Sequence, residues 1–158
     1  MKLNELKENG TFAGVRFDGD TMKGLQQYQK DNNVPNVVGK GKLHCTLLYS
    51  KRHLPNYEAQ GEIDPPLVGK FKKFTIFQSR PDEETEETSN CLVLEFDCPE
   101  LTKRHEDLMK NHNASFDHNE FLPHVTLSYS VGDLKVDDLP NYESDLVMNH
   151  EYSTALQD

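Results

Sequence analysis

Two short segments of the chain carry the same pattern of chemically active side chains. Residues 43–50 and 123–130 align at an offset of 80 with five identities in eight positions, and each contains a His-x-Thr spacing. The four repeated polar side chains are His44, Thr46, His124 and Thr126. An imidazole titrates with an unperturbed pKa of about 6.5, so one histidine can accept a proton while the other donates one. Because a threonine hydroxyl can donate a hydrogen bond to a phosphate oxygen, the four groups predict phosphodiester cleavage without a metal ion.

Both segments are rich in β-forming residues, and side chains alternate between the two faces of a strand. Alternation places every second residue of each segment on the face of the histidine, where a substrate would bind. These residues are His44, Thr46 and Leu48 in the first segment and His124, Thr126 and Ser128 in the second. The residues between them are expected to pack inward. They are Cys45, Leu47 and Tyr49, and Val125, Leu127 and Tyr129.

The elements around the two segments repeat as well. Each segment follows a strand and then a helix, which gives two similar lobes, residues 11–50 and 91–130. Two copies are too few for a solenoid. The pattern therefore predicts a single α+β domain over residues 1–158, with two lobes related by a pseudo-twofold axis. We expect antiparallel sheets, flanking helices and two His-x-Thr strands that face a central cleft.

Hydrophobic periodicity predicts the individual strands and helices. Strands are expected over 11–17, 43–50, 71–79, 91–96, 121–130 and 146–152, and helices over 20–33 and 99–112. Residues 51–68 contain three prolines and a glycine, which predict a long surface loop.

The charge of the chain limits its partners. Of 158 residues, 27 are acidic and 17 are lysine or arginine, so the formal net charge is -10. Duplex nucleic acid and anionic membranes both require a positive field and are not expected partners. No apolar run approaches the roughly 18 residues that span a bilayer, and the first residues show no signal-peptide pattern, so we expect a soluble intracellular protein. Lys42 and other basic residues beside the first motif are expected to form a local rim for a phosphate-containing ligand.

Neither a metal nor another cofactor is expected. The three cysteines show no CxxC spacing, and no HExxH motif occurs. Cys45 adjoins His44 but points to the other face of the strand, so a Cys–His nucleophile pair is not expected. His105 and His112 lie seven residues apart on one face of a helix, which favours a packing role.

The paired His-x-Thr motifs resemble the 2H phosphoesterase superfamily. The first eleven residues and the segments 44–50, 53–57 and 123–129 resemble more narrowly the phage anti-CBASS nucleases. This resemblance implies an enzyme that linearises the cyclic di- and trinucleotide signals of bacterial immunity in the cytoplasm of an infected host. It also implies that the two histidines act as acid and base and that the two threonines orient the phosphate.

The same resemblance implies aromatic side chains and a late glutamate around the bases of the substrate. The matching candidates are Phe12, Phe74 and Glu151. The chain contains no tryptophan, so any indole stacking in relatives must be supplied by phenylalanine or tyrosine.

The motifs contain no credible covalent nucleophile, so we expect the 2′-OH beside the scissile phosphate to attack. Two other functions fit the same motifs. One is an enzyme that acts on RNA ends, at a 2′,3′-cyclic phosphate or a 2′-5′ linkage, and the other is a noncatalytic protein that sequesters cyclic nucleotides. The acidity of the chain weighs against long RNA, and the intact histidines and threonines weigh against simple sequestration.

Overall fold

A computed structural model describes residues 10–79, 84–85, 88–112, 114 and 120–155 of the chain. These residues form six strands and two helices. In chain order they are β1 (Thr11–Phe17), α1 (Gly19–Asp31), β2 (His44–Ser50), β3 (Gly61–Gln78), β4 (Asn90–Asp97), α2 (Pro99–His112), β5 (His124–Ser128) and β6 (Leu146–Ala155). Short 3-10 turns, η2 (Lys40–Lys42) and η3 (Val136–Asp138), lie before β2 and after β5.

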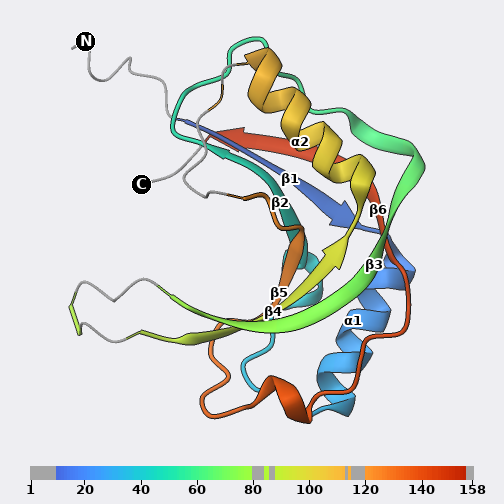
Figure 1. Cartoon of the computed structure of the whole chain (residues 1–158), viewed down its shortest axis with the longest axis vertical. Helices are drawn as coiled ribbons and strands as arrows, with labels where there is room; N and C mark the ends of the chain where they lie inside the picture. Colours follow the sequence, from blue (N-terminus) through green and yellow to red (C-terminus); the bar gives the residue numbers. More distant parts are fainter. Residues whose placement is uncertain (1–9, 80–83, 86–87, 113, 115–119, 156–158) are drawn as a thin grey trace.

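The six strands make one sheet in the order β2-β1-β6-β3-β4-β5, and every pairing is antiparallel. Each end of the sheet comes from one strand–helix–strand lobe, β1-α1-β2 or β4-α2-β5. The long strands β3 and β6 join the lobes at the centre. The sheet curves strongly, so that the motif strands β2 and β5 lie on the inside of the curve (Figure 1). The expected α+β architecture of two similar lobes is confirmed.

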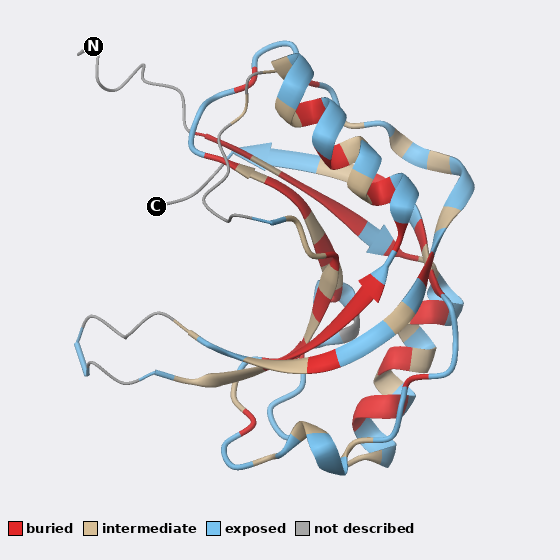
Figure 2. Ribbon diagram, in the orientation of Figure 1, coloured by how far each residue is buried: buried red, intermediate tan, exposed pale blue. Residues whose placement is uncertain are grey.

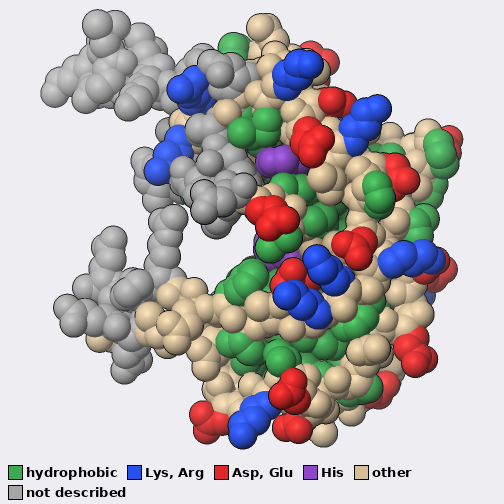
Figure 3. Space-filling model, viewed as in Figure 1, with side chains coloured by type: hydrophobic (Ala, Val, Ile, Leu, Met, Phe, Trp, Pro, Cys, Tyr) green, Lys and Arg blue, Asp and Glu red, His purple; other side chains and the backbone are tan. Residues whose placement is uncertain are grey.

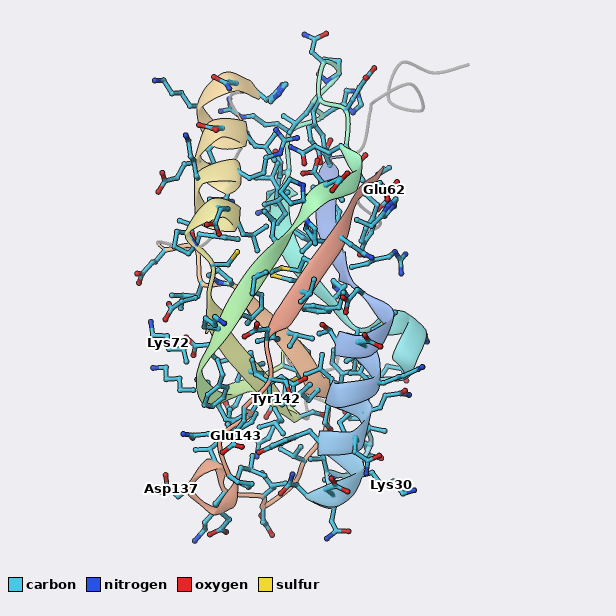
Figure 4. The ribbon with its side chains drawn as sticks, turned by 90° about the vertical axis from the view of Figure 1, so that its right-hand side faces the viewer. Lys30, Glu62, Lys72, Asp137, Tyr142 and Glu143 are labelled. Carbon is cyan, nitrogen blue, oxygen red and sulfur yellow. The ribbon has the colours of Figure 1, made fainter. Side chains whose placement is uncertain are left out.

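The helices cover the outer side of the curved sheet. Viewed from that side, α1 and α2 lie on either side of β3 and β6 (Figure 4). Asp18 begins α1 because its carboxylate accepts a hydrogen bond from the Thr21 N–H at 2.8 Å, and Leu25 on this helix is fully buried. Leu101 and Leu108 bury the corresponding face of α2. Both helices and the strands carry buried residues (Figure 2), and the buried hydrophobic residues form an apolar core that supports both lobes.

The expected loop over residues 51–68 is partly wrong. Its second half belongs to β3, an 18-residue strand that begins at Gly61 and bends through the whole centre of the sheet. The two prolines, Pro65 and Pro66, fall where the pairing of β3 with β6 shifts register between Glu62 and Leu67. A proline lacks the N–H that a ladder requires, so it is tolerated at such an interruption. Within the described residues, no helix is long and apolar enough to cross a membrane.

Candidate functional site

The motif strands β2 and β5 stand at opposite ends of the strand order, yet the curvature of the sheet brings them into contact. The thiol of Cys45 on β2 lies against the backbone N–H of His124 on β5. Burial raises the pKa of this thiol to about 12, and the N–H only partly offsets the rise. Cys45 is therefore an unreactive contact between the two motifs. Histidine side chains line the hollow on this side of the molecule (Figure 3).

Both motif histidines are held in the same way. The Nδ1 atom of His44 lies 2.9 Å from the carbonyl oxygen of Lys42, and that of His124 lies 2.7 Å from the carbonyl oxygen of Leu122. Since a carbonyl can only accept, Nδ1 carries the proton in each ring. The Nε2 atom is then the nitrogen that can exchange a proton with a substrate.

The strict alternation expected for the two motifs is wrong at one point, and it fails in the same way in both. Thr46 pairs with Gly14 while Leu48 pairs with Ala13, so Leu47 is an extra residue in β2. A matching shift in β5 makes Leu127 the extra residue. Such a β-bulge reverses the alternation beyond it. Leu48 and Ser128 are consequently buried on the core side, whereas Tyr49 is half-buried and Tyr129 is exposed rather than packed inward.

Each histidine has an aromatic neighbour. The ring of Phe12 on β1 meets His44 edge-on at a centroid distance of 5.9 Å. The ring of Phe77 on β3 meets His124 edge-on at 6.0 Å, and 39% of Phe77 is exposed. Two aromatic rings beside two imidazoles offer surfaces on which nucleobases can stack.

A cationic and aromatic platform extends the site in the first lobe. Arg16 pairs across the strands with His44, and its guanidinium lies 4.5 Å from the centre of the Tyr152 ring on β6. Tyr152 lies close over β1 because Gly14 has no side chain, and an added Cβ there would stand 2.8 Å from the tyrosine ring. Burial raises the pKa of Tyr152, so the phenol stays protonated at neutral pH.

The second lobe presents a carboxylate in the equivalent place. Glu95 on β4 pairs with His124, and it is buried. Its carboxylate accepts a hydrogen bond from the Thr75 hydroxyl on β3. The cross-strand partner is thus an arginine for His44 and a glutamate for His124.

The structure corrects the expected placement of Phe74. Its ring is buried and stacks on Tyr28 of α1 at a centroid distance of 5.3 Å, within the core. Phe77 follows three residues later and, because side chains alternate along β3, points to the other face, where His124 lies. The base-stacking candidate of this strand is accordingly Phe77.

Glu151 is also placed away from the histidines. It pairs with Val15, whereas His44 pairs with the next residue, Arg16, so the two side chains leave opposite faces of the sheet. Its carboxylate is buried and accepts hydrogen bonds from Arg104 at 2.9 and 3.0 Å, from the Tyr57 hydroxyl at 2.8 Å and from the backbone N–H of Gln60 at 3.0 Å. These bonds tie α2 and the segment before β3 to β6, which is a structural role.

Lys42 stands at the entrance to β2 with an exposed side chain, and its carbonyl oxygen orients His44. Sequence reasoning missed Arg16, Phe77 and Tyr152. One signal was available, because alternation within residues 11–17 puts Phe12, Gly14 and Arg16 on one face. A glycine within such a strand indicates that another group approaches closely.

Solved structures with the same fold define the class of this domain. A protein described as TT0787 of Thermus thermophilus superimposes with a TM-score of 0.59 over 93% of this chain and 94% of its own length, at 15% identity. The apo form of Escherichia coli LigT gives a TM-score of 0.57 over 96% of both chains, at 13% identity. The domain shares the fold of these two proteins.

Sequence comparison narrows this class to a family. The family model described as anti-CBASS protein Acb1 matches residues 9–158, and the chain belongs to this family. A relative from Acinetobacter phage Ac42, "Anti-CBASS protein Acb1", is 31% identical over 156 residues, which cover 99% of this chain and 96% of that protein.

Proposed function

We propose that this protein is a phosphodiesterase that cleaves 3′-5′ linkages in cyclic di- and trinucleotide second messengers, and that it thereby lets a phage evade CBASS immunity. The observation that carries the proposal is the pair of imidazoles on converging strands, each with Nδ1 bonded to a backbone carbonyl. Membership of the anti-CBASS protein family supports the biological setting. The site of action would be the cytoplasm of the infected bacterium.

The proposed reaction uses the substrate's own nucleophile. One histidine removes the proton from the 2′-OH beside the scissile phosphate, and the 2′-oxygen forms a bond to phosphorus. The bond from phosphorus to the 5′-oxygen breaks as the other histidine gives that oxygen a proton. The product is a linear nucleotide with a 5′-hydroxyl and a 2′,3′-cyclic phosphate, which water can later open. A tethered nucleophile gains a large effective molarity, so the protein has to supply only proton transfer and alignment.

Phosphate recognition is assigned to three groups beside the histidines. Thr46 and Thr126 stand two residues after the histidines, before each bulge, and their hydroxyls would donate to the nonbridging oxygens. Arg16 adds a positive charge next to His44 and can offer two parallel N–H donors. Lys42 would contribute further positive charge at the rim, which suits an anionic ring bound by an acidic protein.

Base recognition is assigned to Phe12 and Phe77. Phe12 lies next to His44 and Phe77 lies next to His124, so two bases of a cyclic dinucleotide could each stack on one of these rings. This assignment replaces Phe74 and Glu151 with residues that share the face of the histidines.

No cofactor enters the proposed reaction. The two imidazoles supply the proton transfers, and Arg16 with the two threonine hydroxyls stabilises the charge on phosphorus. In the part of the chain that the structure describes, no three His, Cys, Asp or Glu side chains gather as a metal-binding set. Activity is therefore expected to survive exhaustive chelation.

A product assay on the purified protein tests the proposal. The panel contains cyclic di- and trinucleotides, RNA oligonucleotides ending in a 2′,3′-cyclic phosphate, and 2′-5′ linked dinucleotides. Linearisation of the cyclic nucleotides alone supports the proposal. Preferential turnover of the RNA ends or of the 2′-5′ linkage would assign an RNA-processing enzyme, and tight binding without turnover would assign a sequestering protein.

A further inference from the structure

At the bulges of the two motif strands, two backbone carbonyls accept hydrogen bonds from side chains of the helices. They belong to Leu47 and Leu127, each the residue directly after the motif threonine. A buried carbonyl without a partner costs free energy, so its partners contribute to the stability of the bulge. The Leu47 carbonyl accepts a hydrogen bond from a buried side chain of α2. The Leu127 carbonyl accepts one from a buried side chain of α1 and another from the backbone N–H of Val38 at 2.9 Å.

His105 on α2 holds the bulge of β2. Its Nδ1 atom lies 2.8 Å from the carbonyl oxygen of Leu47, and the side chain is buried. Because a carbonyl only accepts, Nδ1 carries the proton. Burial also lowers the pKa of His105, which favours the neutral imidazole.

Gln29 on α1 holds the bulge of β5 together with the backbone N–H of Val38. Its Nε2 atom donates to the carbonyl oxygen of Leu127 at 2.9 Å and to that of Val38 at 3.3 Å, and the side chain is buried. Each helix therefore binds the motif strand of the other lobe, since α1 follows β1 but contacts β5, and α2 follows β4 but contacts β2.

His105 contacts the second motif as well. Its ring stacks on Phe121 at a centroid distance of 4.1 Å and an interplanar angle of 6°. Phe121 immediately precedes Leu122, whose carbonyl oxygen holds the imidazole of His124. The His105 side chain thus contacts both the strand that carries Thr46 and the segment that directly precedes His124.

We propose that His105 and Gln29 are positioning residues that fix the two β-bulges and thereby aim the motif threonines and histidines at one phosphate. The expected effect on the reaction rate rests on the proposed function, whereas the expected effect on the geometry of the motif strands does not. Moving the extra residue by one position would turn a threonine away from the cleft, because side chains alternate along a strand. Errors of about 1 Å in alignment can cost about 100-fold in rate.

The test compares variants that separate the hydrogen bond from the packing. His105→Phe keeps an aromatic ring on Phe121 and removes the N–H donor, while His105→Gln retains an N–H donor. Gln29→Met removes the donor from the other helix at similar length. Leu101→Val, one turn before His105 on α2, perturbs the core without touching either carbonyl and serves as the matched control. For each variant we would measure Tm, kcat and KM on the cyclic dinucleotide turned over by the wild type, and the NMR methyl resonances of Thr46 and Thr126.

We expect His105→Phe to lower kcat by about 10- to 100-fold with little change in KM, and to shift the Thr46 methyl resonance. His105→Gln should recover most of the loss. Gln29→Met should shift the Thr126 resonance instead, and Leu101→Val should lower Tm while leaving kcat and both methyl resonances at their wild-type values.

The inference is overturned if His105→Phe and Gln29→Met behave like Leu101→Val. Should His105→Phe fail to fold, His105→Gln and Gln29→Met decide the question with the same readouts. If the wild type turns over no cyclic nucleotide, the proposed function fails, and the methyl resonances of the unliganded protein still decide the positioning role.

Discussion

The two lobes share their chemistry but differ in what surrounds it. Each has a His-x-Thr strand, a histidine bonded to a backbone carbonyl and a bulge directly after the threonine. Across the strands, however, His44 faces Arg16 and His124 faces Glu95. The duplicated part is what proton transfer at a phosphate requires. The divergent part is the cross-strand partner, an arginine beside His44 and a glutamate beside His124, so we expect the two lobes to contribute unequally to substrate binding.

The largest effect is expected when either histidine is removed. His44→Ala and His124→Ala should each lower kcat by about 10²–10⁴, because each removes one proton-transfer group. The double variant should lose less than the product of the two single losses, since the groups act as a unit. Single-turnover rates measure this directly, and near wild-type turnover by either single variant would remove that histidine from the mechanism.

The next largest effect concerns the threonines. Thr46→Val and Thr126→Val keep the branched shape that suits a strand and delete the hydroxyl. Each should slow the chemical step by about 10- to 100-fold, less than loss of a histidine, because one neutral hydrogen bond to the phosphate is lost. Single-turnover rates under saturating substrate provide the measurement. If both variants match the wild type, the hydroxyls do not contact the phosphate.

Arg16 is the residue by which the surroundings of His44 differ most clearly from those of His124, so its substitution tests the difference between the lobes. Arg16→Ala should raise KM by about tenfold, because a charged hydrogen bond to the phosphate is lost. Arg16→Lys is the matched control, since it keeps the charge without the planar fork, and it should fall between the wild type and the alanine variant. The KM of the wild type should also rise with ionic strength more steeply than that of Arg16→Ala. Equal KM values and equal salt dependence would show that Arg16 does not bind the phosphate.

A smaller effect is expected at the aromatic rings. Phe12→Ala and Phe77→Ala should each weaken binding of a cyclic dinucleotide by about fivefold or more, because stacking of one base is lost. Phe74→Leu should instead lower Tm and leave affinity unchanged, since Phe74 packs on Tyr28 in the core. Calorimetric titration with a non-hydrolysable analogue compares all three. Weaker binding by Phe74→Leu alone would return the base-stacking role to that residue.

Glu151 should have the smallest effect on catalysis. Glu151→Gln disturbs a partly buried pair with Arg104, and breaking a buried pair costs about 3 kcal/mol. We expect Tm to fall by about 5–10 °C, while KM at a temperature where the variant is folded stays at its wild-type value. Thermal melts and steady-state kinetics check the two parts. A raised KM in a variant with unchanged Tm would mean that the carboxylate reaches the substrate.

The local sequence pattern is sufficient to predict the architecture and the residues that carry the motifs. The repeat around His44 and His124 predicts the two lobes, and alternation predicts the strands. The bulges after Thr46 and Thr126 are not predictable in this way, because an extra residue is defined only against the neighbouring strand. The structure shows that both motifs contain one, which reverses the placement of Tyr49 and Tyr129.

Dependence on the neighbouring strand or helix also explains why the sequence alone misplaced residues around the site. Phe74 and Phe77 are equally plausible in the sequence, and only the register of β3 against β4 decides which of them faces His124. The apolar helical face around His105 indicates packing alone. The acceptor of its hydrogen bond, the carbonyl of Leu47, lies 58 residues away in the chain, where no local pattern points to it.

The nature of the nucleophile is the most direct test of the central claim. The measurement is mass spectrometry of the early products from a 3′-5′ cyclic dinucleotide and from its analogue with a 2′-deoxy sugar at the scissile linkage, both in excess chelator. We predict a linear product with a 5′-hydroxyl and a 2′,3′-cyclic phosphate from the first substrate. The deoxy analogue should bind and remain uncleaved. Rapid cleavage of the analogue, or a product that carries a 5′-phosphate, would contradict attack by the 2′-OH.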